Sequence, residues 1–212
     1  MKKRTFKKEE ILRDYRLANE SRQVSLLGRR EVLGGRANFG LFGDGKEIPQ
    51  IVKAKFFREG DWRSGYYRDQ TFMMAAGLYT LDTFFAQLYG DTDLSRNPDN
   101  GGRLMNCHFA TRSLDDQGEW KDLTKQKNSS GDISPTAGQM PRLVGLALAS
   151  KLFRNLPGEI QDAAKKFTVK GNEVAFGMIG DASTSEGHFW ESVNAAGDRK
   201  STRLNSSHVS EP

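Results

Sequence analysis

The segment Glu173–Ile179, with the sequence EVAFGMI, is followed directly by Gly180–Gly187, with the sequence GDASTSEG. The first of these is mostly apolar and predicts a buried strand, whereas the second is small and polar and predicts a turn. Ser185–Ala196 then has the pattern of a helix, and another helix is predicted before the strand, over Glu159–Phe167. Because helices and strands alternate here, we expect an α/β fold with a mostly parallel sheet flanked by helices.

Upstream of this segment the sequence predicts further helices separated by loops. Pro141 fits the first position of a helix over Arg142–Asn155, since its missing N–H would have no partner there. Thr80 is a suitable N-cap for a helix over Leu81–Tyr89. Two polar, turn-rich stretches are expected to be loops: Asp91–Arg103 and Trp120–Thr136.

The N-terminal part predicts two helices joined by a glycine-rich loop. Phe6–Val24 is amphipathic, with its apolar face formed by Ile11, Leu12 and Tyr15. Ile48–Phe57 predicts a short apolar helix. Gly28–Gly45 lies between them, and because it also carries aromatic residues we expect a packed loop rather than a linker.

The composition narrows the class of protein. The chain has 212 residues, of which 36% are hydrophobic, so it is long enough to bury a sizeable core. Its single cysteine excludes a disulfide scaffold and a cysteine-based zinc site. No apolar run approaches the ~20 residues of a membrane span, and Thr5–Glu10 is polar where a secretory signal would be apolar. We therefore expect a cytoplasmic protein with no membrane partner.

The net charge of +5 also suggests a nucleic-acid-binding protein. The densest basic stretch, Lys2–Arg16, is interrupted by Glu9, Glu10 and Asp14, and the two signs are interleaved elsewhere. The sequence contains no zinc-finger spacing, aromatic RNP motif or basic zipper. The charge pattern favours a solvated helix face, so we expect no nucleic-acid partner.

The turn at Gly180 is where we expect the chemistry of the protein. In an open parallel sheet, ligands bind beyond the carboxyl ends of the strands. Small residues such as Gly180, Ala182 and Ser183 let backbone N–H groups approach a phosphate, which the N-terminus of the next helix also favours. Asp181 offers a hard oxygen ligand for a Mg²⁺ ion that contacts the same phosphate. A structural N-cap role for Asp181 is the alternative that these residues alone leave open.

Four motifs in this chain together resemble one enzyme family. They are Tyr67-Arg68-Asp69, the Met105–Phe109 segment, Ser134-Pro135 followed by Gln139 and Pro141, and Gly180-Asp181 followed by Ser185-Glu186-Gly187. In this order they resemble the thiamine-diphosphate-binding subunit of 2-oxoacid dehydrogenase E1 components. The resemblance runs from about Gly28 to Gly197 and is closest to bacterial branched-chain (2-oxoisovalerate) E1 proteins. It implies a thiamine-diphosphate-binding domain over 28–197, preceded by an N-terminal helical segment over 1–27.

The resemblance implies a set of cofactor contacts. Asp181 would be the first Mg²⁺ ligand, with Gly180, Ala182 and Ser183 around the diphosphate. Ala182 replaces the family's usual glycine, which adds a methyl group beside the phosphate. The Tyr67-Arg68 pair would lie near the cofactor, and a permanently cationic arginine suits a diphosphate.

The resemblance also implies contacts to the rest of the cofactor. Ser134 and the backbone of Thr136 would line the aminopyrimidine, and Gln139 would be a ligand of a structural K⁺ ion. Gly138 stands where the family commonly has threonine, which departs from the pattern of the potassium site. Without the resemblance, this stretch predicts only a polar loop that caps the following helix.

Of three further residues whose side chains could carry chemistry, only His108 is a candidate for a functional role. His108 matches a histidine of the family's Met-Pro-x-His-Tyr segment, although Asn106 replaces the proline, and it would be catalytic by stabilising negative charge. A structural role for His108 is an equal alternative. Cys107 is expected to be a small buried residue. His188 has no matching catalytic position, so we expect it to pack or to lie at the surface.

The implied reaction is attack of the cofactor's carbanion on a 2-oxoacid, loss of CO₂, and transfer of the acyl group to a lipoyl group on an E2 partner. The partner that completes the site would be a β-like E1 half, fused or separate, which supplies the activating glutamate, and the parent protein would be oligomeric. We therefore expect this chain to be inactive alone. Another thiamine-diphosphate enzyme, such as a transketolase-like protein, is the main alternative.

Residues 198–212 differ in kind from the rest of the chain. From Asp198 to His208 the sequence reads DRKSTRLNSSH, which is the translation of a widely used sequencing-adapter oligonucleotide. We interpret 198–212 as a non-native tail, with a natural polar tail as the alternative. On this interpretation the domain is incomplete at its C-terminus, and the position of the second Mg²⁺ ligand falls in the tail.

Overall fold

A computed structural model describes residues 6–98 and 100–198 of the chain. These form two compact units, the first comprising 6–56 and 67–107 and the second comprising 57–66 and 108–198. The interpretation of 198–212 as a tail therefore falls outside the described residues, except for Asp198.

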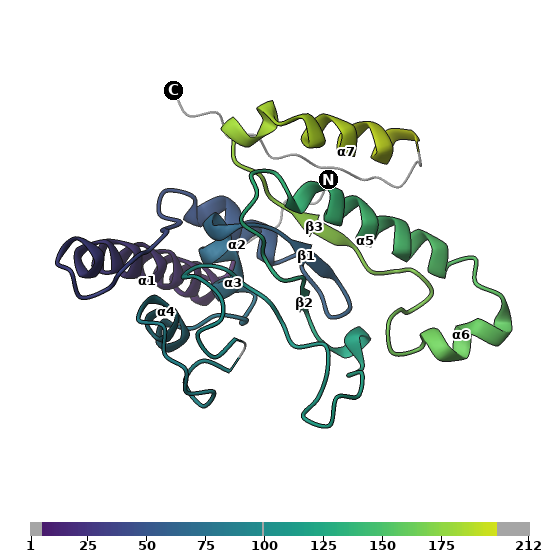
Figure 1. Cartoon of the computed structure of the whole chain (residues 1–212), viewed down its shortest axis with the longest axis horizontal. Helices are drawn as coiled ribbons and strands as arrows, with labels where there is room; N and C mark the ends of the chain where they lie inside the picture. The colour runs from purple at the N-terminus through teal and green to yellow at the C-terminus, as the bar shows by residue number, and fades with distance from the viewer. Residues whose placement is uncertain (1–5, 99, 199–212) are drawn as a thin grey trace. The chain divides into compact units, whose positions relative to one another are not determined.

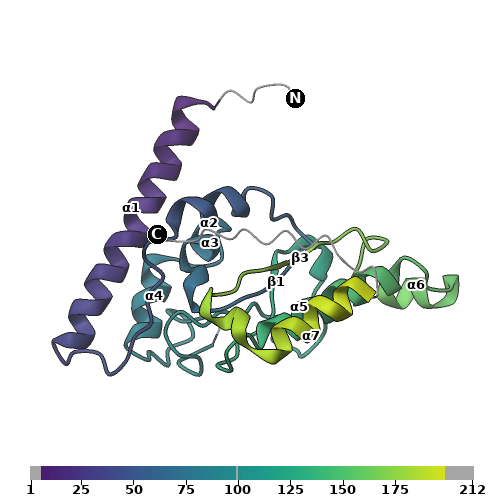
Figure 2. The ribbon, with the colours of Figure 1, turned by 90° about the horizontal axis from the view of Figure 1, so that it is seen from above.

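The first unit is helical. Its elements are α1 (Lys8–Leu33), α2 (Glu47–Ala54), the short 3-10 helix η1 (Tyr67–Asp69), α3 (Gln70–Ala75) and α4 (Leu81–Leu88). The long helix α1 contacts α2, α3 and α4 (Figure 2). The core gathers around Phe72 and Phe84, neither of which is exposed to solvent. Neither η1 nor α3 was predicted from the sequence.

The helix α1 is longer than predicted and buries a different face. It continues through Gly28 to Leu33, so the loop expected over Gly28–Gly45 begins later than predicted. Its buried residues are small or polar along most of the face: Ser21, Val24, Ser25, Gly28 and Glu31. The predicted apolar face is instead exposed, with Tyr15 at 71%. The N-terminal half of α1 is held by two ion pairs, from Lys55 to Glu10 and to Asp14, whereas the buried residues of its C-terminal half pack on the other helices of the unit.

Other elements of the first unit follow the sequence closely. The predicted cap of α4 is confirmed, because the Thr80 hydroxyl accepts from the Thr83 amide at 3.1 Å and the Thr83 hydroxyl accepts from the Thr80 amide at 2.8 Å. In the glycine-rich loop, Phe42 packs against Phe84 with ring centroids 6.3 Å apart. Phe39 is 51% exposed, so the expectation that the loop's aromatic residues are buried holds only for part of it.

The second unit contains the sheet. Strands β1 (Trp62–Ser64), β2 (Asn128–Ser129) and β3 (Ala175–Gly177) lie in the order β2-β1-β3, and both pairs are parallel. This confirms the predicted α/β fold with a parallel sheet. Only β3 was predicted. It is half-buried rather than buried, because within the described sheet it lies at the edge and β1 is its one neighbouring strand.

The helices of the second unit are α5 (Gln139–Phe153), α6 (Gly158–Ala164) and α7 (Gly187–Asp198), with two 3-10 helices, η2 (Leu123–Lys125) and η3 (Ala182–Ser185). The helix α5 packs on β1 and β3, and α7 packs beside α5 (Figure 1). Pro141 is the third residue of α5 rather than the first, a position at which its missing N–H still removes no intrahelical hydrogen bond.

A small apolar core joins these elements. Buried Ala137, Met140 and Leu143 contact Ala175, Ile179 and Phe189. The core therefore links the start of α5, the strand β3 and the start of α7, which adjoin the candidate residues of the 134–139 segment and of the turn at Gly180. Over the described residues, no helix is both long enough and apolar enough to cross a membrane.

Candidate functional site

The turn at Gly180 follows the end of the parallel strand β3, as predicted. It is held by its own hydrogen bonds, since the Ser183 amide donates to the Gly180 carbonyl at 3.1 Å and the Thr184 amide to the Asp181 carbonyl at 3.0 Å. Asp181 and Ala182 are exposed. Asp181 directly precedes η3, and its side chain accepts no capping hydrogen bond from that described 3-10 helix, so η3 gives no support to the N-cap alternative.

Gly180 leaves a small space in the turn. A Cβ atom placed there would lie 3.4 Å from the Ser183 hydroxyl oxygen and 3.7 Å from the Tyr66 ring. These are ordinary contact distances, so the backbone does not require glycine at this position. The nearest atoms to this position come from the Ser183 hydroxyl group and from the ring and hydroxyl group of Tyr66. Sequence reasoning missed Tyr66, although its place immediately before Tyr67-Arg68 was a signal.

The segment that carries Ser134 and Thr136 lies beside this turn. Ser134 and Thr136 are exposed, whereas Gln139 is 5% exposed and its amide nitrogen donates to the Met178 carbonyl at 2.9 Å. The His188 ring nitrogen Nε2 lies 2.6 Å from the Thr136 carbonyl oxygen. The structure therefore brings the 134–139 segment and the turn together through two side-chain contacts, neither of which was predicted.

Two residues of β1 anchor the 130–139 segment from the sheet. The Arg63 side chain is fully buried and binds Asp132, and its guanidinium carbon lies 5.1 Å from the centre of the Phe109 ring. The Ser64 hydroxyl donates to the Gln139 carbonyl at 3.0 Å. Neither residue was a sequence candidate, because β1 itself was not recognised and its polar residues gave no apolar pattern.

Gly138 occupies a tight position in the same segment. A Cβ atom there would lie 2.8 Å from the Ile133 side chain and 3.0 Å from the Pro135 carbonyl oxygen. A larger residue, such as the threonine common in the resembled family, would force this loop to move. The local backbone is therefore adapted to glycine.

Tyr67 and Arg68 belong to the first unit and are half-exposed there. The Arg68 guanidinium carbon lies 5.2 Å from the centre of the Tyr67 ring, so the two side chains stack. Gln50 of α2 holds this turn, because its amide nitrogen donates to the Arg68 carbonyl and its oxygen accepts from the Phe72 amide at 2.8 Å. Gln50 was not a sequence candidate.

His108 and Cys107 lie in different units. His108 is 7% exposed and belongs to the second unit. Cys107 is fully buried in the first unit and its thiol lies 3.5 Å from the Gln70 side-chain oxygen, which confirms it as a small buried residue.

Carboxylates suitable for a metal are sparse. Among the described residues there is no group of three or more His, Cys, Asp or Glu side chains that could hold a metal ion. Mg²⁺, however, is usually bound through one or two carboxylates together with waters and phosphate oxygens. A single exposed Asp181 is compatible with that mode of binding and not with an all-protein metal cage.

The fold and the site define an α/β protein with a turn of small and polar residues at the carboxyl end of a parallel strand. This is the place at which α/β sheets commonly bind ligands. A family model described as Dehydrogenase E1 component matches residues 27–202. The chain therefore belongs to the dehydrogenase E1 component family, an enzyme family that generally uses thiamine diphosphate. No curated protein was found to match the chain. The match begins inside α1, so most of that helix precedes it.

Proposed function

We propose that this chain is the cofactor-binding part of the E1 component of a 2-oxoacid dehydrogenase, acting on a branched-chain substrate. The observation that carries the proposal is the contact of His188 with Thr136, which joins the turn at Gly180 to the 134–139 segment. These are the two segments of the second unit that the resemblance connects with the diphosphate and the aminopyrimidine. The overall reaction would release CO₂ from the 2-oxoacid and move the acyl group to the lipoyl disulfide of E2, which is thereby reduced.

The residues of the turn fit a Mg²⁺-bound diphosphate. Asp181 presents its carboxylate at the surface of the turn, and Ser183 offers a hydroxyl group beside the space at Gly180. An anion at this place would also be favoured by the N-terminus of α7, which begins at Gly187. We assign Asp181 to Mg²⁺, and Gly180, Ala182 and Ser183 to the diphosphate.

The remaining candidates would position the rest of the cofactor. Ser134 and the Thr136 backbone would contact the aminopyrimidine, and Tyr67-Arg68 would contribute cationic charge. Gln139 is proposed as a K⁺ ligand through its side-chain oxygen, since its nitrogen donates to Met178. When bound, thiamine diphosphate would supply the nucleophilic carbon and accept the electron pair released with CO₂. His108 would stabilise negative charge on the substrate.

We also propose that activity depends on partners. A β-like E1 half would supply the glutamate that activates the aminopyrimidine, and a lipoyl-bearing E2 would accept the acyl group. The chain alone is then expected to be inactive and to bind thiamine diphosphate only weakly. Micromolar binding by the chain alone, measured by calorimetry, would contradict the need for a β-like half.

A titration followed by NMR tests the cofactor site. Thiamine diphosphate with Mg²⁺ should shift the backbone amide signals of 180–183, whereas thiamine without the diphosphate should not. Chelating Mg²⁺, or the substitution Asp181→Asn, should remove most of the effect, because the carboxylate no longer completes the ion's oxygen shell. Equal shifts with and without Mg²⁺ would argue against the assignment of Asp181.

The substrate class requires a separate assay. With a β-like half added, 2-oxoacid-dependent reduction of an artificial electron acceptor should occur, and branched-chain 2-oxoacids should be preferred. Transfer of a two-carbon unit between sugar phosphates, without 2-oxoacid oxidation, would instead support a transketolase-like enzyme.

The assignment of 28–197 as the cofactor-binding domain, of 1–27 as a separate helical segment and of 198–212 as a non-native tail is also a proposal. The family match extends to residue 202, inside the proposed tail. Sequencing the gene from an independent clone tests the assignment. Codons for 198–212 that match the chain would contradict the tail.

A further inference from the structure

His188 contacts the Thr136 backbone, at a point where two parts of the proposed cofactor site meet. It is the second residue of α7, and its Nε2 atom lies 2.6 Å from the carbonyl oxygen of Thr136, far away in the sequence. Both residues belong to the second unit. Because a carbonyl oxygen only accepts hydrogen bonds, Nε2 must carry the proton in this contact. The contact therefore specifies the donor atom of the imidazole.

The backbone next to Thr136 is held in an uncommon conformation. Ala137 has a φ of +60°, in the left-handed region that residues other than glycine seldom adopt. Such a conformation persists where surrounding contacts impose it. Ala137 is 2% exposed and packs in the core with Met140, so its side chain is fixed from the inside. His188 fixes the neighbouring carbonyl group from the outer side.

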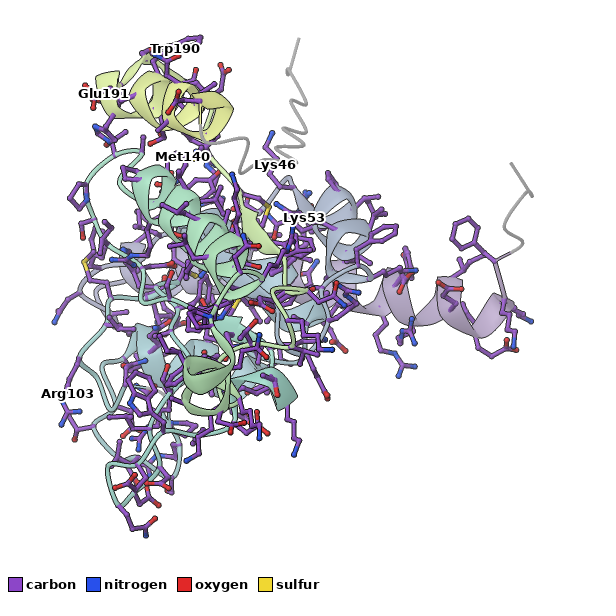
Figure 3. All side chains as sticks on the ribbon, turned by 90° about the vertical axis from the view of Figure 1, so that its right-hand side faces the viewer. Lys46, Lys53, Arg103, Met140, Trp190 and Glu191 are labelled. Carbon is purple, nitrogen blue, oxygen red and sulfur yellow. The ribbon has the colours of Figure 1, made fainter. Side chains whose placement is uncertain are left out.

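A second contact joins the same two segments. The Gln139 amide nitrogen donates to the Met178 carbonyl, just before Gly180, at 2.9 Å. The apolar core that includes Ile179 and Phe189 fills the space between these segments. By contrast, Trp190 and Glu191 point away from α5 on the outer side of α7, and Trp190 is 62% exposed (Figure 3). Loss of the His188 side chain would thus remove one contact and leave the core in place.

We propose that His188 is a positioning residue that holds the Thr136 segment against the turn at Gly180, so that both can contact one cofactor molecule. This inference rests on the proposed function, because the two segments need a fixed spacing only if they share a ligand. The role is exerted through the Thr136 carbonyl and involves no contact of His188 with the reacting atoms. Without this contact, the Thr136 loop is expected to sample other conformations, and binding then includes the cost of ordering it.

The experiment compares the full chain with three variants by isotope-edited NMR. His188→Ala and His188→Phe remove the donor, whereas His188→Gln places an amide N–H near the position of Nε2 and serves as the matched control. Without ligand, the two donor-free variants should shift the Thr136 carbonyl signal and accelerate hydrogen exchange at the Gly138 amide, which bonds the Pro135 carbonyl. The amide signals of β1 should be unchanged in all variants, which verifies the fold.

The second measurement is the affinity for thiamine diphosphate with Mg²⁺, read from the amide signals of 180–183. The donor-free variants should bind about three- to tenfold more weakly, as expected for one lost hydrogen bond, and His188→Gln should bind within about twofold of the native chain. Native-like binding by His188→Ala and His188→Phe would overturn the inference while leaving the proposed function intact. No binding by the native chain even with the β-like half added would refute the cofactor site, and the ligand-free comparison would still decide whether His188 orders the Thr136 loop.

Discussion

Arg63 and Asp132 form a buried, two-point ion pair inside the second unit. Arg63 Nη1 lies 2.9 Å from Asp132 Oδ1 and Nη2 lies 3.0 Å from Oδ2, with side-chain exposures of 0% and 1%. The same guanidinium donates to the Ser129 hydroxyl at 2.8 Å and to the Tyr66 carbonyl at 3.1 Å. The pair therefore ties β1 to the segment that leads into Ser134.

Breaking this pair should strongly destabilise the second unit. Arg63→Met leaves the Asp132 carboxylate buried without its cation, and we expect a loss of about 3–5 kcal/mol in the free energy of unfolding, because an uncompensated buried charge is costly. Asp132→Leu should have a similar effect. Urea denaturation, monitored by a probe in the second unit, measures both.

Two controls make this prediction specific. The double variant with Arg63→Met and Asp132→Leu should lose less than the sum of the single variants, since no charge is left unpaired. Lys165→Ala removes an exposed ion pair with Asp162 and should cost no more than about 1 kcal/mol. Additive losses in the double variant would show that the two residues act independently.

Two helical glycines should respond in opposite ways to the same substitution. A Cβ atom at Gly28 in α1 would lie 2.5 Å from the Phe42 ring and 3.0 Å from Phe84. Gly28→Ala should therefore destabilise the first unit by about 1–3 kcal/mol through overpacking. Gly145 in α5 has no heavy atom within 4 Å of the same position, so Gly145→Ala should stabilise its helix by about 0.5–1 kcal/mol. Thermal unfolding of both variants tests the contrast, and stabilisation by both would show that Phe42 moves aside readily.

How far the sequence predicts this fold depends on how local the determining contacts are. The helix α4 and its cap were predicted because Thr80 and Thr83 interact within one turn. The burial of α1 was mispredicted because its buried face carries Ser21 and Ser25, which bond to Thr71 and Gln70 of α3. Periodicity detects apolar faces, and it does not detect a polar face that is satisfied by another helix.

The candidate site shows the same division. Asp181 and its turn were predicted because the residues are contiguous and follow an apolar strand. Arg63, Gln50 and His188 were missed as anchors, because their partners lie far away in the sequence. A polar residue alone gives no signal of a specific distant partner, so its role emerges only when the chain is folded.

The acid limb of the stability curve should depend on Glu31. Hydrogen bonds from Arg36 and then from Tyr89 lower the pKa of the Glu31 carboxyl group to about 2. The pKa of this group in the unfolded chain is about 4.3, which is higher than the folded pKa. The contribution of Glu31 to stability is therefore complete when the pH is well above the unfolded pKa, and it is lost as the pH falls towards the folded pKa of about 2. Glu31→Gln should therefore show a smaller decrease in urea midpoint between about pH 5 and pH 3. Glu119→Gln, at an exposed site, is the control, and its urea midpoint should depend on pH as that of the native chain does. The same pH dependence in Glu31→Gln as in the native chain would contradict the prediction.

Gln50 should matter for the Tyr67-Arg68 turn more than its position in a short helix suggests. It is 3% exposed, and Gln50→Leu would deprive the Phe72 amide and the Arg68 carbonyl of their bonded partner in a buried place. We expect a loss of about 2–3 kcal/mol in the stability of the first unit, because unsatisfied buried polar groups carry a desolvation cost. Gln23→Leu, on the exposed side of α1, is the matched control and should change stability by less than about 0.5 kcal/mol. Hydrogen exchange at the Phe72 amide gives an independent readout. It should accelerate in Gln50→Leu alone, whereas equal protection in both variants would mean that α3 is capped without Gln50.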